Sequence, residues 1–314
     1  MIHQNIVIAG VRISFWTNHP ADIACIEDIF LYHPDRSDLP IDAKNRHDVV
    51  IMSGFEKIRL PTDYPLVWKG LVNQQIPVCW YNPTDRGENV VIVDDGILIR
   101  YFVEKKLTVC YLSEIKTRFG KSHRPLLENC IFFLIQSVLS MHGRYSLHAS
   151  CVSKNGYALL FPGKSGEGKT TISVILGEAG YEYMGDDLVF ISQDEAGEVM
   201  INGFLTKIKL FNPKSKEKET VDVIKDRRFK YATQSKLGAI INLRRACNSK
   251  KSTLIPTSTQ TETFSQLINA GNNIVIQYRP DLWMNICERA SLAPSFALVF
   301  GDKDFFDPAI LEAI

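Results

Sequence analysis

Short apolar runs suited to β-strands dominate the chain up to about residue 118. These runs occupy residues 6–8, 11–15, 89–93, 97–102 and 107–112. The last three have the spacing of a meander, and the dipeptide Asp95–Gly96 favours a tight hairpin turn between two of them. The stretch from His33 to Pro65 is rich in Asp, Pro and Arg, which predicts loops around one or two short strands. We therefore expect a β-rich N-terminal domain over residues 1–118, with acceptor recognition as its expected role.

Helical and strand patterns mix in the remaining residues, 119–314. Apolar residues recur at helical spacing over 124–142, with Pro125 in the first turn and Gly143 after the end, which predicts a buried helix. Its apolar stretch is too short to span a bilayer and contains Gln136. Helices are also predicted over 171–179 and 261–270, and strands over 146–152, 157–161, 238–243 and 295–300. Within residues 181–191, Asp186 and Asp187 stand at the start of a further predicted apolar strand. This order predicts an α/β domain.

A glycine-rich segment between the predicted strand 157–161 and the predicted helix 171–179 has the pattern G-x-x-x-x-G-K-[ST] of a phosphate-binding P-loop. In such a loop the backbone N–H groups surround the phosphates, the lysine reaches the outer phosphates, and the hydroxyl ligates Mg²⁺. The helix N-terminus faces the phosphates as well. The sequence therefore predicts that ATP or GTP is bound by Gly163, Lys164, Ser165, Gly166, Glu167, Gly168, Lys169, Thr170 and Thr171.

Candidate polar residues lie before and after this loop. His148 precedes Gly163 by 15 residues, and Asp186 and Asp187 follow it by 23 and 24 residues. A carboxylate at the end of a neighbouring strand is placed to reach Mg²⁺ or the proton of a nucleophile. Two simpler interpretations stay open: the Asp pair as a turn, and His148 as a core histidine bonded to a backbone carbonyl.

Together these residues resemble the HPr kinase/phosphorylase family over about residues 146–191. The similarity is closer to HPr-kinase-like proteins of bacterial peptide-tailoring clusters, including lasso-peptide kinases. It implies a P-loop kinase domain of the HPr kinase / PEP carboxykinase-like type, in residues 119–314, that uses ATP and Mg²⁺ and phosphorylates a serine hydroxyl. The resemblance makes Asp186 the general base, places Asp187 on Mg²⁺ or against that base, and puts His148 beside the phosphates.

Two departures from the family pattern affect the expected reaction. The segment 202–210 lacks a Glu-x-Arg-Gly sequence, and residues 307–314 lack a basic tail. Both favour a one-way kinase with an acceptor other than HPr, such as a small precursor peptide or another peptide or protein. Two alternatives stay open: a kinase of a free small-molecule hydroxyl, and a non-catalytic nucleotide-binding regulatory or scaffold module.

Basic residues follow the Asp pair. Lys207, Lys209, the run Lys214–Lys230, and Arg244 with Arg245 at the end of a predicted strand supply this charge. We expect them to hold an anionic acceptor or the transferring phosphoryl group, because arginine binds two oxygens at once. For the run Lys214–Lys230, a solvated surface segment is the open alternative.

The composition and net charge indicate which classes of partner are expected. The 314 residues are 45% hydrophobic and 23% charged, with a net charge of +1, so neither nucleic acid nor a membrane is an expected partner. The seven cysteines form no CxxC pair, which predicts free thiols in a reducing compartment. The N-terminus has no secretion-signal pattern. We therefore expect a cytoplasmic protein, with a homo-oligomer left open.

Overall fold

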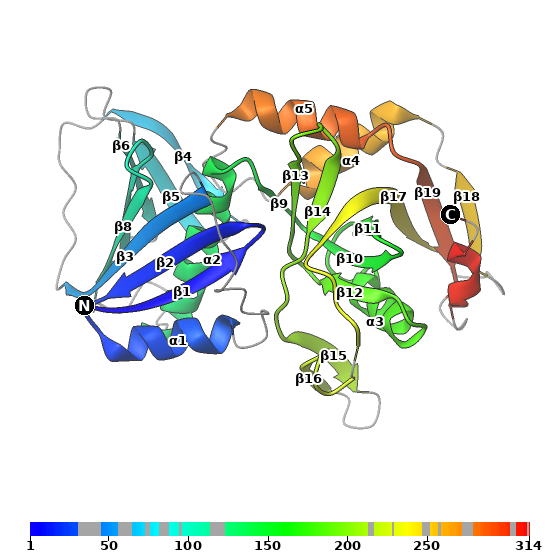
Figure 1. The fold of residues 1–314 in the computed structure, drawn as a ribbon, viewed down its shortest axis with the longest axis horizontal. Helices are drawn as coiled ribbons and strands as arrows, with labels where there is room; N and C mark the ends of the chain where they lie inside the picture. Colours follow the sequence, from blue (N-terminus) through cyan, green and yellow to red (C-terminus); the bar gives the residue numbers. More distant parts are fainter. Residues whose placement is uncertain are drawn as a thin grey trace. The chain divides into compact units, whose positions relative to one another are not determined.

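The computed structural model describes residues 1–30, 45–55, 65–72, 76–81, 88–93, 96–113, 123–212, 217–227, 229–246, 252–256, 259–271, 279–301, 306–312 and 314. The fold is mixed α/β, rich in strands and built on several sheets (Figure 1). It forms two compact units, the first over Met1–His142 and the second over Gly143–Asn272 and Arg279–Ile314. Each unit is described by itself.

An eight-stranded sheet forms the centre of the first unit, in the order β1-β2-β3-β8-β7-β6-β5-β4. The predicted strand pair and meander are confirmed, and β3 is a ten-residue strand in a stretch for which short strands were expected. Residues 31–44 and 56–64, and Asp95 of the predicted turn, lie outside the described residues. The strands are β1 (Ile2–Ile8), β2 (Val11–Thr17), β3 (Arg46–Phe55), β4 (Leu66–Val72), β5 (Ile76–Tyr81), β6 (Glu88–Val93), β7 (Ile97–Phe102) and β8 (Leu107–Ser113).

Two helices complete the first unit, α1 (Pro20–Phe30) and α2 (His123–Met141). The predicted buried helix is confirmed as α2, but it belongs to the first unit, so the expected boundary at residue 118 is wrong. The physical reason is packing: α2 contacts α1, and Cys130 Sγ lies 3.3 Å from Cys110 Sγ of β8. Within the described part of the chain, no helix is long and apolar enough to cross a membrane.

A nine-stranded mixed sheet organises the second unit, in the order β12-β10-β11-β17-β14-β13-β9, with β19 between β17 and β18. The pairs β11–β17 and β17–β19 are parallel, and the other pairs are antiparallel. Its strands are β9 (Tyr145–Leu147), β10 (Ala149–Lys154), β11 (Tyr157–Pro162), β12 (Glu182–Gly185), β13 (Val189–Gln193), β14 (Val199–Asn202), β17 (Gln234–Arg245), β18 (Thr253–Pro256) and β19 (Ser295–Phe300).

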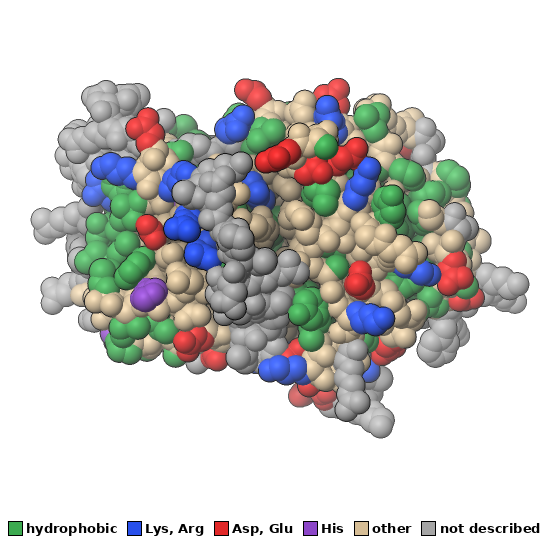
Figure 2. Space-filling model, in the orientation of Figure 1, with side chains coloured by type: hydrophobic (Ala, Val, Ile, Leu, Met, Phe, Trp, Pro, Cys, Tyr) green, Lys and Arg blue, Asp and Glu red, His purple; other side chains and the backbone are tan. Residues whose placement is uncertain are grey.

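Helices cover both faces of this sheet (Figure 1). On one face α3 (Lys169–Glu178) packs into a core with Phe161 and Ile241, and on the other α4 (Gln260–Ala270) and α5 (Pro280–Ala290) pack over Leu160 and Ile240. The predicted helices at 171–179 and 261–270 are thereby confirmed. On the face seen in Figure 2, basic and acidic side chains are interspersed over this unit.

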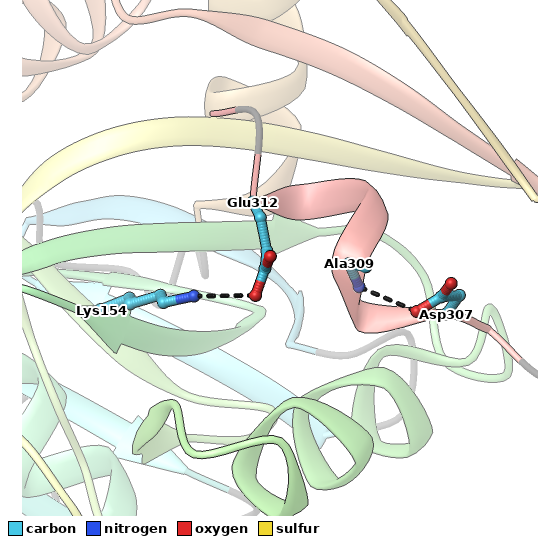
Figure 3. A network of polar contacts seen from close by, with 4 residues as sticks. All are labelled: Lys154, Asp307, Ala309 and Glu312. Carbon is cyan, nitrogen blue, oxygen red and sulfur yellow. Dashed lines mark hydrogen bonds and ion pairs between the residues drawn. The ribbon is translucent and has the colours of Figure 1, made fainter.

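A small hairpin, β15 (Ile208–Asn212) with β16 (Glu217–Val221), forms a separate two-stranded sheet. It holds part of the basic run predicted from the sequence; Lys214, Lys216 and Arg228 lie outside the described residues. Near the C-terminus, the short helix η2 (Pro308–Leu311) begins where Asp307 accepts a hydrogen bond from the Ala309 N–H. An ion pair of 3.4 Å between Lys154 Nζ and Glu312 ties this end to β10 (Figure 3).

The strand predicted to start at the Asp pair is present as β13. A strand before the pair, β12, was not predicted, and Asp186 and Asp187 lie in the break between the two strands. The backbone of Asp187 is left-handed, with φ 61°, which a continuous strand does not allow. β12 pairs with β10, whereas β13 pairs with β9 and β14, so the Asp pair connects separate parts of the sheet.

Gly203 provides a stability test of this break. A Cβ atom there would lie 2.5 Å from the carbonyl oxygen of Met184, in β12, and 2.9 Å from that of Ala232. Because both neighbours are backbone atoms, we expect Gly203→Ala to lower the free energy of unfolding by about 1–3 kcal/mol. Chemical denaturation measures this change, with Lys209→Ala on the exposed side of β15 as the control. Equal stability of Gly203→Ala and wild type would contradict the close approach.

Candidate functional site

The glycine-rich segment forms a loop between β11 and α3, as the sequence predicted. Gly166 and Gly168 have φ values of 89° and 94°, a left-handed conformation that favours glycine. Gly168 is the N-cap of α3 and leaves the first turn of that helix without a side-chain cap. The first N–H groups of a helix lack internal partners, so this end of α3 is suited to an anion.

Lys169 is the buried cation of this loop, with only 3% of its surface exposed. Its Nζ donates hydrogen bonds of 2.9 Å to the carbonyl oxygens of Gly163 and Lys164. In the described part of the chain, no carboxylate forms an ion pair with this ammonium group. The positive charge is therefore held in place by neutral groups and stays available to an anionic ligand.

His148 lies beside this ammonium. Its Nδ1 is 3.1 Å from the carbonyl oxygen of Asp187, and its Nε2 is 3.4 Å from Lys169 Nζ. A carbonyl oxygen only accepts and an ammonium only donates, so both contacts are hydrogen bonds in the tautomer that carries its proton on Nδ1. His148 is thus bonded to a backbone carbonyl, as the simpler interpretation expected. It also contacts the P-loop lysine.

Asp186 joins three elements through its two carboxylate oxygens. Oδ2 accepts a 2.7 Å hydrogen bond from Thr170 of α3, and Oδ1 accepts one from the Ser150 hydroxyl of β10. Burial raises the pKa of Asp186 above its ordinary value, while the bonds from Ser150 and Thr170 and the charge of Lys169 act in the opposite direction. The sequence analysis did not predict the bond between Ser150 and Asp186.

Thr170 and Asp186 are the residues that fit Mg²⁺ best. Two oxygens 2.7 Å apart suit neighbouring positions around an ion that is bound at about 2.0–2.1 Å. No group of three His, Cys, Asp or Glu that suits a metal occurs among the described residues. Mg²⁺ seldom needs one, because it is usually held by one or two carboxylates together with phosphates and water.

Asp187 contributes its backbone to the site. Its carbonyl holds His148, whereas its side chain is exposed and makes no hydrogen bond with Thr170 among the described residues. The structure therefore brings Asp186 to Thr170, and Asp187 to His148. The expected metal contact of Asp187 stays a prediction.

Glu167 has a role in the loop that its position in the motif did not predict. Its Oε2 accepts a 2.9 Å hydrogen bond from the backbone N–H of Lys164 and lies against Gly163. A backbone N–H at this point of a P-loop is a donor for phosphate. An anion that uses this N–H therefore has to displace the carboxylate of Glu167.

A cavity of about 330 Å³ adjoins the loop. Arg244 lines it, whereas Arg245 and the described part of the run 214–230 are absent from its lining. Three polar residues in it, Asn242, Gln266 and Asn269, were not predicted. The lining residues are His148, Pro162, Gly163, Lys164, Glu167, Asn242, Leu243, Arg244, Gln266, Asn269 and Ala270.

Comparison with known proteins gives a distant structural similarity. No family model matches the chain, and no curated protein matches it. Among solved structures, the Hpr(Ser) kinase/phosphatase from Coxiella burnetii is similar, with 11% sequence identity and a TM-score of 0.30. The match covers 54% of this chain and 90% of that one. At this TM-score it is a hint of family and carries no argument about the reaction.

Substitution of Lys169 tests the P-loop. We expect Lys169→Ala to abolish binding of ATP·Mg²⁺, because the charge that faces the outer phosphates is lost. Isothermal titration calorimetry gives the affinity, and circular dichroism checks that the fold is retained. Lys154→Ala, which removes a lysine of β10 paired with Glu312, is the matched control. Wild-type affinity in Lys169→Ala would exclude this loop as the nucleotide site.

Substitution of Glu167 has the opposite expected effect. Glu167→Gln and Glu167→Ala remove a negative charge from the anion-binding side of the loop, so both should bind ATP·Mg²⁺ several-fold more tightly than wild type. The same titration measures this gain. Glu178→Gln changes the same charge at the far end of α3 and should leave the affinity unaltered. Weaker binding in both Glu167 variants would show that this carboxylate assists the ligand.

Proposed function

We propose that this protein is an ATP- and Mg²⁺-dependent kinase that transfers the γ-phosphoryl group to a hydroxyl. A serine of a peptide or protein is the proposed acceptor, and an HPr-kinase-like P-loop domain is the proposed catalytic unit. The observation that carries the proposal is the buried Lys169 ammonium, which has no carboxylate partner among the described residues and lies inside a P-loop. The neighbouring contacts of Thr170 with Asp186 support it.

The proposed binding roles follow from the contacts of each residue. The loop N–H groups and Lys169 hold the β- and γ-phosphates, and His148, next to Lys169, lies beside them. Thr170 and Asp186 would hold Mg²⁺, with Asp187 as the further ligand suggested by the sequence. The ion would supply positive charge that offsets the charge of the phosphate oxygens during transfer.

The proposed chemistry needs one base. Asp186 takes the proton of the acceptor hydroxyl while the acceptor oxygen forms a bond to the γ-phosphorus. The bond between that phosphorus and the oxygen bridging the β- and γ-phosphates breaks, and ADP leaves. Oδ2 of Asp186, which accepts from Thr170, would face the ion, whereas Oδ1, which accepts from Ser150, keeps a second lone pair for the acceptor proton.

Two other functions are separated from this one by direct assay. A kinase of a small-molecule hydroxyl would label polyols, and a regulatory or scaffold module would bind ATP without transfer. Incubation with γ-labelled ATP, Mg²⁺ and separate panels of serine-bearing peptides and polyols distinguishes all three. Label on peptides alone supports the proposed acceptor class, and label on neither panel would overturn the kinase.

Substitution of Asp186 tests the base. Asp186→Asn should keep ATP binding and lower the rate of transfer by a factor of about 10²–10⁴, because the amide does not take up the acceptor proton. Single-turnover transfer from labelled ATP measures the rate, and Asp194→Asn, in the turn after β13, is the matched control. A near wild-type rate in Asp186→Asn would assign the base to Asp187 or to water.

The pH dependence of the transfer rate is a second test of Asp186 as the base. Burial raises the pKa of Asp186 above its ordinary value of 3.8, so the carboxylate form is lost as the pH falls through this higher pKa. The wild-type rate should therefore decline on the acid side at a higher pH than for an exposed aspartate. This acid limb should be absent from the residual activity of Asp186→Asn.

A further inference from the structure

Two side-chain amides in the cavity beside the P-loop have atoms that the fold does not satisfy. Nδ2 of Asn242 and Oε1 of Gln266 are buried and have no hydrogen-bond partner among the described residues. Asn242 is only 8% exposed. Both residues line the cavity.

Folding alone does not explain these amides. β17 is otherwise apolar at this point, and Asn242 follows Ile240 on the face of the sheet that α4 and α5 cover. Gln266 lies one turn before Ala270 of α4, whose carbonyl accepts the backbone N–H of His148 at 2.7 Å. A buried amide atom without a partner costs about 1–3 kcal/mol. An apolar side chain at either position would avoid that penalty.

The cavity lies on the side of the outer phosphates. Its lining includes His148, whose Nε2 is 3.4 Å from Lys169 Nζ, and a P-loop lysine reaches the β- and γ-phosphates. The first half of the loop, with Gly163 and Lys164, also lines the cavity, whereas Thr170 and Thr171 at the start of α3 are absent from the lining. This is the position of the acceptor in a phosphoryl transfer, because the acceptor attacks the terminal phosphorus.

We propose that Asn242 and Gln266 determine acceptor specificity by binding an uncharged group that carries a hydrogen-bond donor and a hydrogen-bond acceptor next to the reacting hydroxyl. This proposal rests on the proposed kinase function. Nδ2 donates to the group and Oε1 accepts from it; a half-turn of either carboxamide exchanges its N and O atoms, so both polarities are met.

A carboxamide or peptide group, or a second hydroxyl, carries this chemistry. The volume of about 330 Å³ is at the small end of ligand sites, which span roughly 300–1,000 Å³, so the cavity holds the reacting part of an acceptor. Asn269 of α4 and the exposed Arg244 of β17 complete its polar wall. Separate probes in the test distinguish a carboxamide or peptide group from a second hydroxyl.

The test is calorimetric titration of the full chain, saturated with ADP·Mg²⁺, with N-acetyl-L-serinamide and separately with glycerol. Wild type should bind at least one probe, and Asn242→Leu and Gln266→Leu should each weaken that binding by tenfold or more. Gln260→Ala, an exposed glutamine of the same helix, is the matched control and should bind as wild type does. The affinity for ADP·Mg²⁺ should be unchanged in every variant.

Thermal unfolding distinguishes a binding role of Asn242 from a structural role. Because the free protein leaves Asn242 Nδ2 without a partner, Asn242→Leu should unfold at a temperature equal to or above that of wild type while binding the probe less tightly. A lowered melting temperature together with unchanged probe affinity would identify a structural residue and overturn the proposal.

The remaining outcomes separate this inference from the proposed function. Failure of wild type to bind either probe, or unchanged probe affinity in both leucine variants, would overturn it. Loss of ADP·Mg²⁺ affinity in the leucine variants would assign the cavity to the nucleoside and also overturn it, leaving the kinase proposal intact. If wild type binds no ADP·Mg²⁺, the kinase proposal fails, and the same probe titrations without nucleotide decide the role of the amides.

Discussion

A single buried charge organises the site. The ammonium of Lys169 is satisfied by two carbonyl oxygens of its own loop and lies next to His148, so its position is set by the backbone of the strand-loop-helix unit. A charge buried among neutral groups is stable only when each of its hydrogen bonds is made. The geometry of the glycine-rich turn, the start of α3 and the orientation of His148 therefore all depend on this contact.

Asp186 links the same loop to the rest of the sheet. Its bonds to Ser150 and Thr170 join β10, α3 and the break between β12 and β13. The carbonyl of Asp187 adds His148 to this arrangement. Asp186 therefore holds Thr170 through its side chain, and the adjacent Asp187 holds His148 through its backbone carbonyl.

The sequence predicted the parts of this site that are local. A strand, a glycine-rich turn and a helix are consecutive, so the motif from Gly163 to Thr170 and its context could be recognised. Asn242 and Gln266 come from separate elements, and no pattern in the chain marks them as neighbours. The domain boundary failed for the same reason, since the packing of α2 against α1 is a long-range contact.

The parallel ladder between β11 and β17 has a consequence for how the ligand preference of the cavity changes. Both strands run toward the site: β11 leads into the P-loop, and β17 carries Asn242 and Arg244 near its end. Because backbone hydrogen bonds hold these strands in register, and β17 is held again by β19, the floor of the cavity does not widen without breaking the sheet. A different ligand is therefore accommodated through exchange of side chains on a fixed backbone, which confines evolutionary change to a few positions of β17 and α4.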